Sequence, residues 1–353
     1  MAYTTIDDPS AYFQTALYSS DSSSVTVTND GNSDLQPDWI WIKVRNGTNN
    51  HNTFDTSRGI ANRLKPNDTA AEDGSSGVSV SSDGFATGTS LGDINNTGGS
   101  NTYVAWQWKA NGGTTASNSN GTNITSTVQA NTTAGFSIVT FTGTGDDGDS
   151  YGHGLSSAPE LVFPKKRSGT SNWQGYAFDG GNSQYFYLNL TNAFTSTSGN
   201  SAASSSTVIT TDGSGDSNPD GGTVVSYCFH SVQGYSKIGR YTGNGNADGP
   251  FVYTGFKPAW LMYRNTSRSE NWIIVDNKRN TINPVSGANL QANVSDAEAT
   301  ETRWEQDFLS NGFKIRTDGS QNNANNGDGE TIIYMAFAEH PFVSSEGVPA
   351  TAR

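Results

Sequence analysis

The chain repeats one pattern three times, and this repetition constrains its fold more than any other feature. Each copy opens with a proline and a hydrophobic segment that ends in a basic residue: Pro37–Lys43, Pro159–Lys165 and Pro258–Arg264. Downstream of each proline, a second apolar stretch ends in an aspartate: Asp55, Asp179 and Asp276. A third hydrophobic segment follows at 103–108, 224–229 and 334–338. A period of about 100 to 120 residues matches a whole domain rather than a solenoid repeat. The sequence therefore predicts three related domains in tandem.

The apolar residues indicate an all-β fold. They come in short runs separated by stretches rich in Ser, Thr, Asn, Asp and Gly, and glycine alone supplies 40 residues. Short strands bounded by turn residues are typical of a sandwich or barrel. We therefore expect three β-sandwich domains of lectin-like or jelly-roll-like type with very little helix. The best helical candidate is 296–308, and even this segment reads equally as a loop followed by a strand.

The repeat also sets the expected domain limits, which are 1–130, 131–232 and 233–353. The first domain is expected to end in a flexible linker at 111–131, because Ile124 and Val128 are the only large apolar residues there. The second and third domains share a Gly-aromatic-Ser lead-in, at Gly135 and Gly234. The first lacks it, and a strand within 11–18 is the expected substitute.

Three equivalent cores are predicted from the strand residues that alternate toward one face. They are expected on Trp39, Trp41, Trp106 and Trp108, on Leu161, Phe163, Tyr227 and Phe229, and on Trp260, Met262, Tyr334 and Phe337. Pro164 interrupts the second copy's strand and suggests an edge strand there. Cys228 falls in a predicted core strand and is interpreted as a buried thiol.

Motifs that carry chemistry are weak in this chain. The glycines at 143–148 follow a strand but precede no helix, so a hairpin turn is favoured over a dinucleotide site. The four histidines have no zinc spacing. Asp212, Asp216 and Asp220 supply carboxylates within nine residues, so a Ca²⁺ loop stays open beside the favoured acidic solvated loop. No other cofactor is expected.

Recurring Asp-x-x-Arg pairs, Asp55 with Arg58 and Asp276 with Arg279, are interpreted as ion pairs that close loops. A catalytic constellation seldom occurs twice in a repeat array. The net charge of −13 disfavours a nucleic-acid partner. No apolar segment is long enough to insert in a membrane.

Partner contacts are expected where the three copies differ, in their loops. The tentative contact surface consists of Tyr185, Tyr187, Thr197, Ser206, Asn283 and Trp304. The aromatic residues among them are of the type that is enriched at interface centres.

Several specific strings in the chain resemble a known family. They include MAYTTIDDPSAYFQTALY, QPDWIWIK, NTYVAWQWKANGG, GYSKIGRYTGNGNADGPFVYTGFKPAW and IYMAFAEHPF. The chain resembles uncharacterised β-rich proteins of marine bacteriophages, especially phages of cyanobacteria and pelagic bacteria, which are regarded as virion structural or tail-associated proteins. The resemblance covers nearly the whole chain and brings no catalytic residues with it.

The resemblance implies a virion protein that is made in the host cytoplasm without a signal peptide. We expect a particle-surface protein that acts in assembly and binding, as a head decoration or as a tail or fibre component. Its expected partners are other virion proteins, further copies of itself and a host surface glycan. The alternative is a tail polysaccharide depolymerase, a glycoside hydrolase or lyase, with an acid pair such as Asp212 and Asp216 in a groove.

Overall fold

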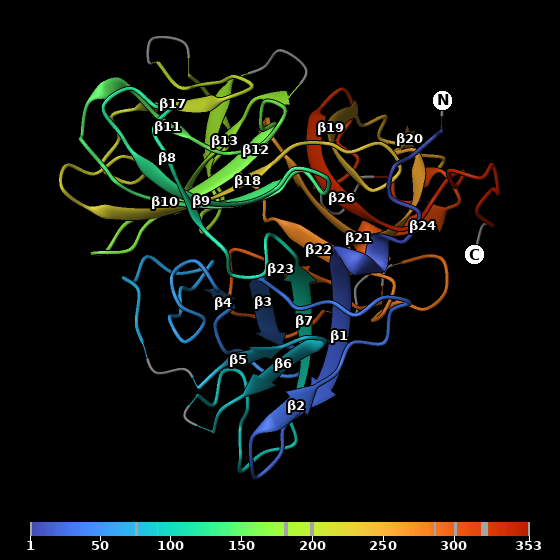
Figure 1. Ribbon diagram of the computed structural model, residues 1–353. Coiled ribbons are helices and arrows are strands. Elements are labelled where there is room, and N and C mark those ends of the chain that lie inside the picture. Colours follow the sequence, from blue (N-terminus) through green and yellow to red (C-terminus); the bar gives the residue numbers. More distant parts are fainter. Residues whose placement is uncertain are drawn as a thin grey trace.

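The fold is all-β, as the sequence predicts. The computed structural model describes residues 2–74, 77–89, 91–179, 183–197, 201–285, 287–299, 302–318 and 324–351. The strands form antiparallel sheets, and the helical elements of these residues are the short 3-10 turns η1 (Pro9–Ala11) and η3 (Thr302–Trp304). The ribbon has three lobes, one for each copy of the repeat (Figure 1). In the described ranges no helix has the length and apolar character needed to cross a bilayer.

Each lobe contains an inner sheet and a smaller outer sheet. In the first unit the inner sheet has the order β1-β7-β3-β4 and the outer sheet β2-β6-β5. Their bounds are β1 Phe13–Ser19, β2 Val25–Val27, β3 Trp39–Val44, β4 Asn52–Asp55, β5 Ser79–Ser81, β6 Gly84–Thr87 and β7 Thr102–Trp108.

The second unit has the longest inner sheet, in the order β15-β14-β13-β12-β18-β10-β9-β8, with an outer sheet β11-β17-β16. The inner strands are β8 Ala116–Asn118, β9 Ser126–Asn131, β10 Phe136–Thr142, β12 Leu161–Lys166, β13 Gln174–Ala177, β14 Gln184–Tyr187, β15 Thr195–Ser196 and β18 Thr223–Phe229. The outer strands are β11 Asp147–Gly152, β16 Ala203–Ser204 and β17 Val208–Asp212.

The third unit repeats the same arrangement, with an inner sheet β19-β26-β21-β22-β23 and an outer sheet β20-β25-β24. The bounds are β19 Ser236–Thr242, β20 Phe251–Tyr253, β21 Phe256–Asn265, β22 Ile273–Asp276, β23 Leu290–Gln291, β24 Gln306–Leu309, β25 Gly312–Ile315 and β26 Thr331–Pro341. The common inner order is thus β1-β7-β3-β4, β10-β18-β12-β13 and β19-β26-β21-β22.

The central strands of the inner sheets are buried on both faces. In β3, Ile40 and Ile42 pack with Phe85 of the outer sheet, in a cluster that forms the first unit's own core. Trp39 and Trp41 point to the opposite face, which lies against the other units. The six residues of β3 are all buried, because each face of the strand meets a different hydrophobic cluster.

The prediction of three separate cores is wrong. Nearly all of the residues assigned to them meet in one cluster shared by all three units, here called the central core. It contains Trp39, Trp41, Trp106 and Trp108, then Leu161, Phe163, Tyr227 and Phe229, then Trp260, Met262, Met335 and Phe337. Tyr334 lies instead in the third unit's own core. The strands alternate as expected, but the face that carries the largest rings is turned toward the neighbouring units.

Further expectations need correction. The segment 111–131 is not a linker, because β8 and β9 extend the second unit's inner sheet by pairing with each other and with β10. The candidate helix at 296–308 forms only η3 and then β24. Pro164 lies in an interior strand, since β12 has β13 and β18 on its two sides. It is tolerated because β13 pairs only with Leu161 and Val162.

Candidate functional site

The three units meet at three boundaries, and pairing registers show which residues are equivalent. Trp39 pairs with Trp108 and Asp55, Leu161 pairs with Phe229 and Ala177, and Trp260 pairs with Phe337 and Asp276. The position of Asp55 and Asp276 is therefore occupied by Ala177 in the second unit. Asp179, which the sequence comparison placed there, lies two residues farther along. We call the boundaries the 1–2, 2–3 and 3–1 seams after the units they join.

The 1–2 seam is held by a buried charged network. Asp55 accepts hydrogen bonds from the Arg58 Nε at 2.5 Å and, across the seam, from the Tyr227 hydroxyl at 2.6 Å. The Arg58 side chain has no exposed surface and also pairs with Glu72 at 2.6 Å. Glu72 in turn crosses the seam to Arg167 at 2.8 Å. Burial raises the pKa of Tyr227 well above its ordinary value, so this hydroxyl remains a donor.

The 3–1 seam repeats this network with equivalent residues. Asp276 accepts from the Arg279 Nε at 2.7 Å and from the Trp106 Nε1 of the first unit at 3.0 Å. Glu298 joins Arg279 to Arg45 across the seam. The Asp-x-x-Arg pairs are thus confirmed as ion pairs, and each also fastens one unit to the next.

The 2–3 seam replaces the same network with apolar groups. Ala177 stands in the position of the aspartate, and Met335 stands where the other units have Tyr227 and Trp106. The backbone N–H of Phe194 donates to the backbone oxygen of Thr266. The backbone N–H groups of Glu72 and Glu298 donate in the same way to the backbone oxygens of Arg167 and Arg45. Phe194 therefore takes the place of the glutamate, and its ring stacks with Phe186 and packs against Trp272. The acceptor and the donor are lost together, so neither is left buried without the other.

The basic residues that end the repeated strands of the second and third units also contribute to the seams. The ammonium group of Lys165 reaches the backbone oxygen of Thr69 in the first unit at 3.1 Å. The guanidinium of Arg264 bonds to the backbone oxygens of Tyr187 and Asn192 in the second unit. Burial lowers the pKa of Lys43 and of Lys165 to about 8. Lys165 and Arg264 are thus structural groups between units, whereas Lys43 bonds to the backbone oxygens of Val44 and Gly47 in its own unit.

The predicted contact residues do not form one surface. Tyr185 and Tyr187 are partly exposed and lie edge-to-face, with ring centroids 6.0 Å apart. Ser206 is exposed, and Asn283 is partly buried with its side chain bonded to the Phe308 backbone. Thr197 is only 4% exposed and Trp304 only 1%. Both are wrong as contact residues, because Thr197 bonds to Ser183 and Trp304 packs in the third unit's own core.

The acidic loop of the second unit is held by protein donors. Asp212 accepts from the Tyr176 hydroxyl at 2.5 Å and from the Gln174 amide at 2.8 Å. Asp216 instead accepts from the Asn172 backbone at 2.9 Å, and Asp220 is exposed. Within the described ranges, no cluster of three or more His, Cys, Asp or Glu residues could hold a metal ion. Asp212 and Asp216 bind separate partners, so the three aspartates do not form the calcium loop that the sequence left open beside the favoured acidic solvated loop.

The sequence predicted the environment of the cysteine correctly. Cys228 is buried as predicted, and burial raises its pKa to about 12, so its thiol is unreactive.

An exposed aromatic pair was missed: Phe251 and Tyr253 on the edge strand β20 are 46% and 52% exposed. Their alternation around the buried Val252 was the available signal.

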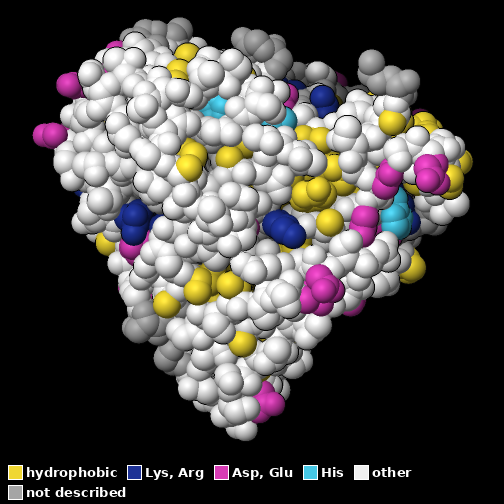
Figure 2. Space-filling view, in the orientation of Figure 1, with side chains coloured by type: hydrophobic (Ala, Val, Ile, Leu, Met, Phe, Trp, Pro, Cys, Tyr) yellow, Lys and Arg dark blue, Asp and Glu magenta, His cyan; other side chains and the backbone are white. Residues whose placement is uncertain are grey.

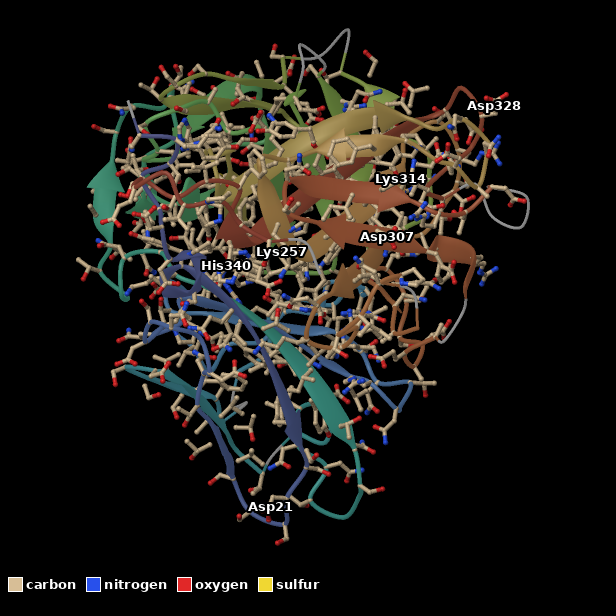
Figure 3. The ribbon with its side chains drawn as sticks, turned by 90° about the vertical axis from the view of Figure 1, so that its right-hand side faces the viewer. Asp21, Lys257, Asp307, Lys314, Asp328 and His340 are labelled. Atoms are coloured by element: carbon tan, nitrogen blue, oxygen red, sulfur yellow. The ribbon has the colours of Figure 1, made fainter. Side chains whose placement is uncertain are left out.

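The 3–1 seam contains a cavity of about 250 Å³. The first unit contributes the start of β1 and the loop 30–32, and the third unit contributes Ala259, Asn277, Lys278, Glu339 and His340. Figure 3 places His340 beside Lys257, where the third unit's sheet passes over the start of β1. In Figure 2, basic, acidic and histidine side chains surround hydrophobic atoms in the same region.

Each carboxylate around this cavity already has partners. Asp8 accepts from Ser10 and Ser33, and Asp30 pairs with Lys278 at 2.7 Å. Glu339 accepts from Lys257 and from Asn277. The hydroxyl of Thr15, a lining residue, is by contrast buried and has no hydrogen-bond partner in the part of the chain that the structure describes.

Comparison with known proteins adds a family but no function. A family model described as a domain of unknown function, DUF7483, matches residues 8–341. The chain belongs to the DUF7483 family. No curated protein and no solved structure matches it. The DUF7483 match runs from Asp8 through β26, so it includes all three units, the three seams and the cavity at the 3–1 seam.

Proposed function

We propose that the protein is a non-enzymatic binding and assembly protein exposed on the surface of a bacteriophage particle. The observation that carries the proposal is the closure of the three repeats around the central core. Two arginines with fully buried side chains, Arg58 and Arg279, help to hold neighbouring units together. Such a body is rigid and presents three different outer sheets and loop sets around one core, which suits a scaffold for attachment.

The resemblance to marine phage proteins supplies the particle context for this proposal. In that context the partners are other virion proteins, further copies of the chain and a host surface glycan. The aromatic pair Phe251 and Tyr253 is the best candidate for contact with another virion protein. Large aromatic side chains contribute heavily at interface centres, and β20 offers them on the edge of an outer sheet.

Labelling of purified particles with an antibody against the chain tests the location. The proposal predicts labelling at one defined place, on the head or on the tail. A phage that carries Phe251→Ser and Tyr253→Ser should incorporate less of the protein, while Asp21→Asn, an exposed change at the tip of the first unit (Figure 3), should not alter incorporation. Absence of the protein from purified particles would contradict the proposal.

Enzymatic activity is tested separately with the purified protein and host surface polysaccharide. The proposal predicts no release of reducing ends or unsaturated products. Release that disappears after Asp212→Asn or Asp216→Asn would favour the depolymerase alternative.

A further inference from the structure

The cavity at the 3–1 seam arises from two departures from the repeat. The residue after the repeated proline is Asp38 in the first unit, Glu160 in the second and Ala259 in the third. Asp38 accepts a hydrogen bond from the Ala110 backbone, and Glu160 accepts one from the Ser231 backbone of its own unit. Ala259 has no such side chain, and it lines the cavity.

The opposite wall departs from the repeat as well. Thr15 pairs with Trp106, Ile138 with Tyr227 and Ile238 with Met335, so these three residues are equivalent. Both isoleucines pack in the central core. Thr15 is equally buried, at 4% exposure, but its hydroxyl has no hydrogen-bond partner among the described residues, and the residue lines the cavity. An unpaired buried hydroxyl costs stability, so its presence at a core position suggests that a ligand completes it.

The equivalent places at the other two seams are filled by the protein itself. At the 1–2 seam, the Gln129 amide of β9 bonds to Thr56 and Ser57. These residues are the counterparts of Asn277 and Lys278, which line the cavity. At the 2–3 seam, Arg240 forms a bidentate pair with Asp179, the counterpart of Lys278. Among the described residues, side chains thus occupy the equivalent places at the 1–2 and 2–3 seams, and the place at the 3–1 seam holds the cavity.

We propose that this cavity binds one sugar ring, either a free monosaccharide or the terminal residue of a glycan. Its volume of about 250 Å³ is below the roughly 300–1,000 Å³ of drug-sized ligand pockets, which limits it to one ring. Its carboxylates are already compensated by Lys278, Lys257 and hydroxyl donors, so a neutral ligand fits better than a cation. Phe13 and Ala338 provide apolar wall, and Thr15 provides a hydroxyl, which matches the mixed surface of a sugar. The site goes beyond the proposed function, because it would exist whether or not the protein belongs to a particle.

Saturation-transfer NMR with the intact chain tests the site. The probes are the methyl glycosides of glucose, galactose, mannose and N-acetylglucosamine, with putrescine as a cationic comparison. At least one glycoside should bind, and putrescine should not. Oligosaccharides that end in the preferred sugar should bind at least as well as its glycoside if glycan ends are the natural source, whereas binding of the free sugar alone identifies a monosaccharide site.

Variants at the two departures decide where the sugar binds. Thr15→Val removes the hydroxyl at nearly constant volume and should weaken binding by about fivefold, the effect of one hydrogen bond. Thr15→Ile restores the residue of the other units and should abolish binding while the melting temperature stays equal or rises. Asp21→Asn, far from the cavity (Figure 3), is the control and should bind as the unaltered chain does. The proposal is overturned if no glycoside binds, if putrescine binds instead, or if Thr15→Ile binds as well as the unaltered chain.

Discussion

Removal of the Asp55 carboxylate tests the role of the seam networks. Asp55→Ala deprives three donors of their acceptor: the Arg58 backbone N–H at 2.8 Å, the Arg58 Nε at 2.5 Å and the Tyr227 hydroxyl at 2.6 Å. Both members of the ion pair have fully buried side chains. Breaking one partner of a buried pair typically costs about 3–5 kcal/mol. Because Glu72 still pairs with Arg58, we expect a loss of about 3 kcal/mol in the free energy of unfolding.

Urea unfolding followed by tryptophan fluorescence measures this loss. The matched control is Asp30→Ala, whose pair with Lys278 is exposed by 70% and 40% at its two side chains, and an exposed pair contributes only about 0–1 kcal/mol. The equivalent change Asp276→Ala should resemble Asp55→Ala, since it also leaves a buried arginine and a donor from the next unit without the carboxylate. A loss below about 1 kcal/mol for Asp55→Ala would refute the view that these pairs fasten the units together.

Three further predictions follow from the same contacts. Trp106→Ala should lower stability by about 3–5 kcal/mol in urea unfolding, because the indole is fully buried in the central core; a loss below about 1 kcal/mol would place it outside any core. Ala177→Asp should lower the melting temperature strongly, because a carboxylate there would be buried opposite Leu161 without a donor such as Tyr227; an unchanged melting temperature would contradict the assignment of the 2–3 seam as apolar. Burial lowers the pKa of His51 well below 6.5, so the unfolded chain takes up a proton there before the folded chain does, and stability should fall as the pH drops below about 6.5. Melting temperatures between pH 7.5 and 5 should therefore depend less on pH in His51→Gln, and an equal slope would argue against a buried neutral imidazole.

The strand positions and the repeat could be predicted because short apolar runs and turn-forming residues alternate regularly. The substitute strand expected within 11–18 is confirmed by β1, and the buried Cys228 by β18. The shared central core was not predicted, although a signal for it was present. The residues of Trp39–Val44 are apolar at four successive positions, from Trp39 to Ile42, whereas a strand buried on one face only would alternate with polar residues.

Other parts of the structure left weaker signals in the sequence. The polar composition of 111–131 resembles a linker, but its two large apolar residues, Ile124 and Val128, are buried in the second unit's own core. Asp179 was misplaced because it was matched by residue type: it follows Pro159 by 20 residues, whereas Asp55 and Asp276 follow their prolines by 18, and both that spacing and strand pairing put Ala177 at the position. The cavity depends on Thr15 and Ala259, which become notable only once the registers show what the other units have in their place.

The most direct test of the closed three-unit body is differential scanning calorimetry of the intact chain. Since the units share the central core and each seam joins two of them, they should unfold together. We predict a single transition in which the van't Hoff and calorimetric enthalpies agree, and Asp55→Ala should shift that whole transition to lower temperature. Two or three separate transitions, with Asp55→Ala moving only the first or second of them, would contradict the account and show that the repeats are independent domains.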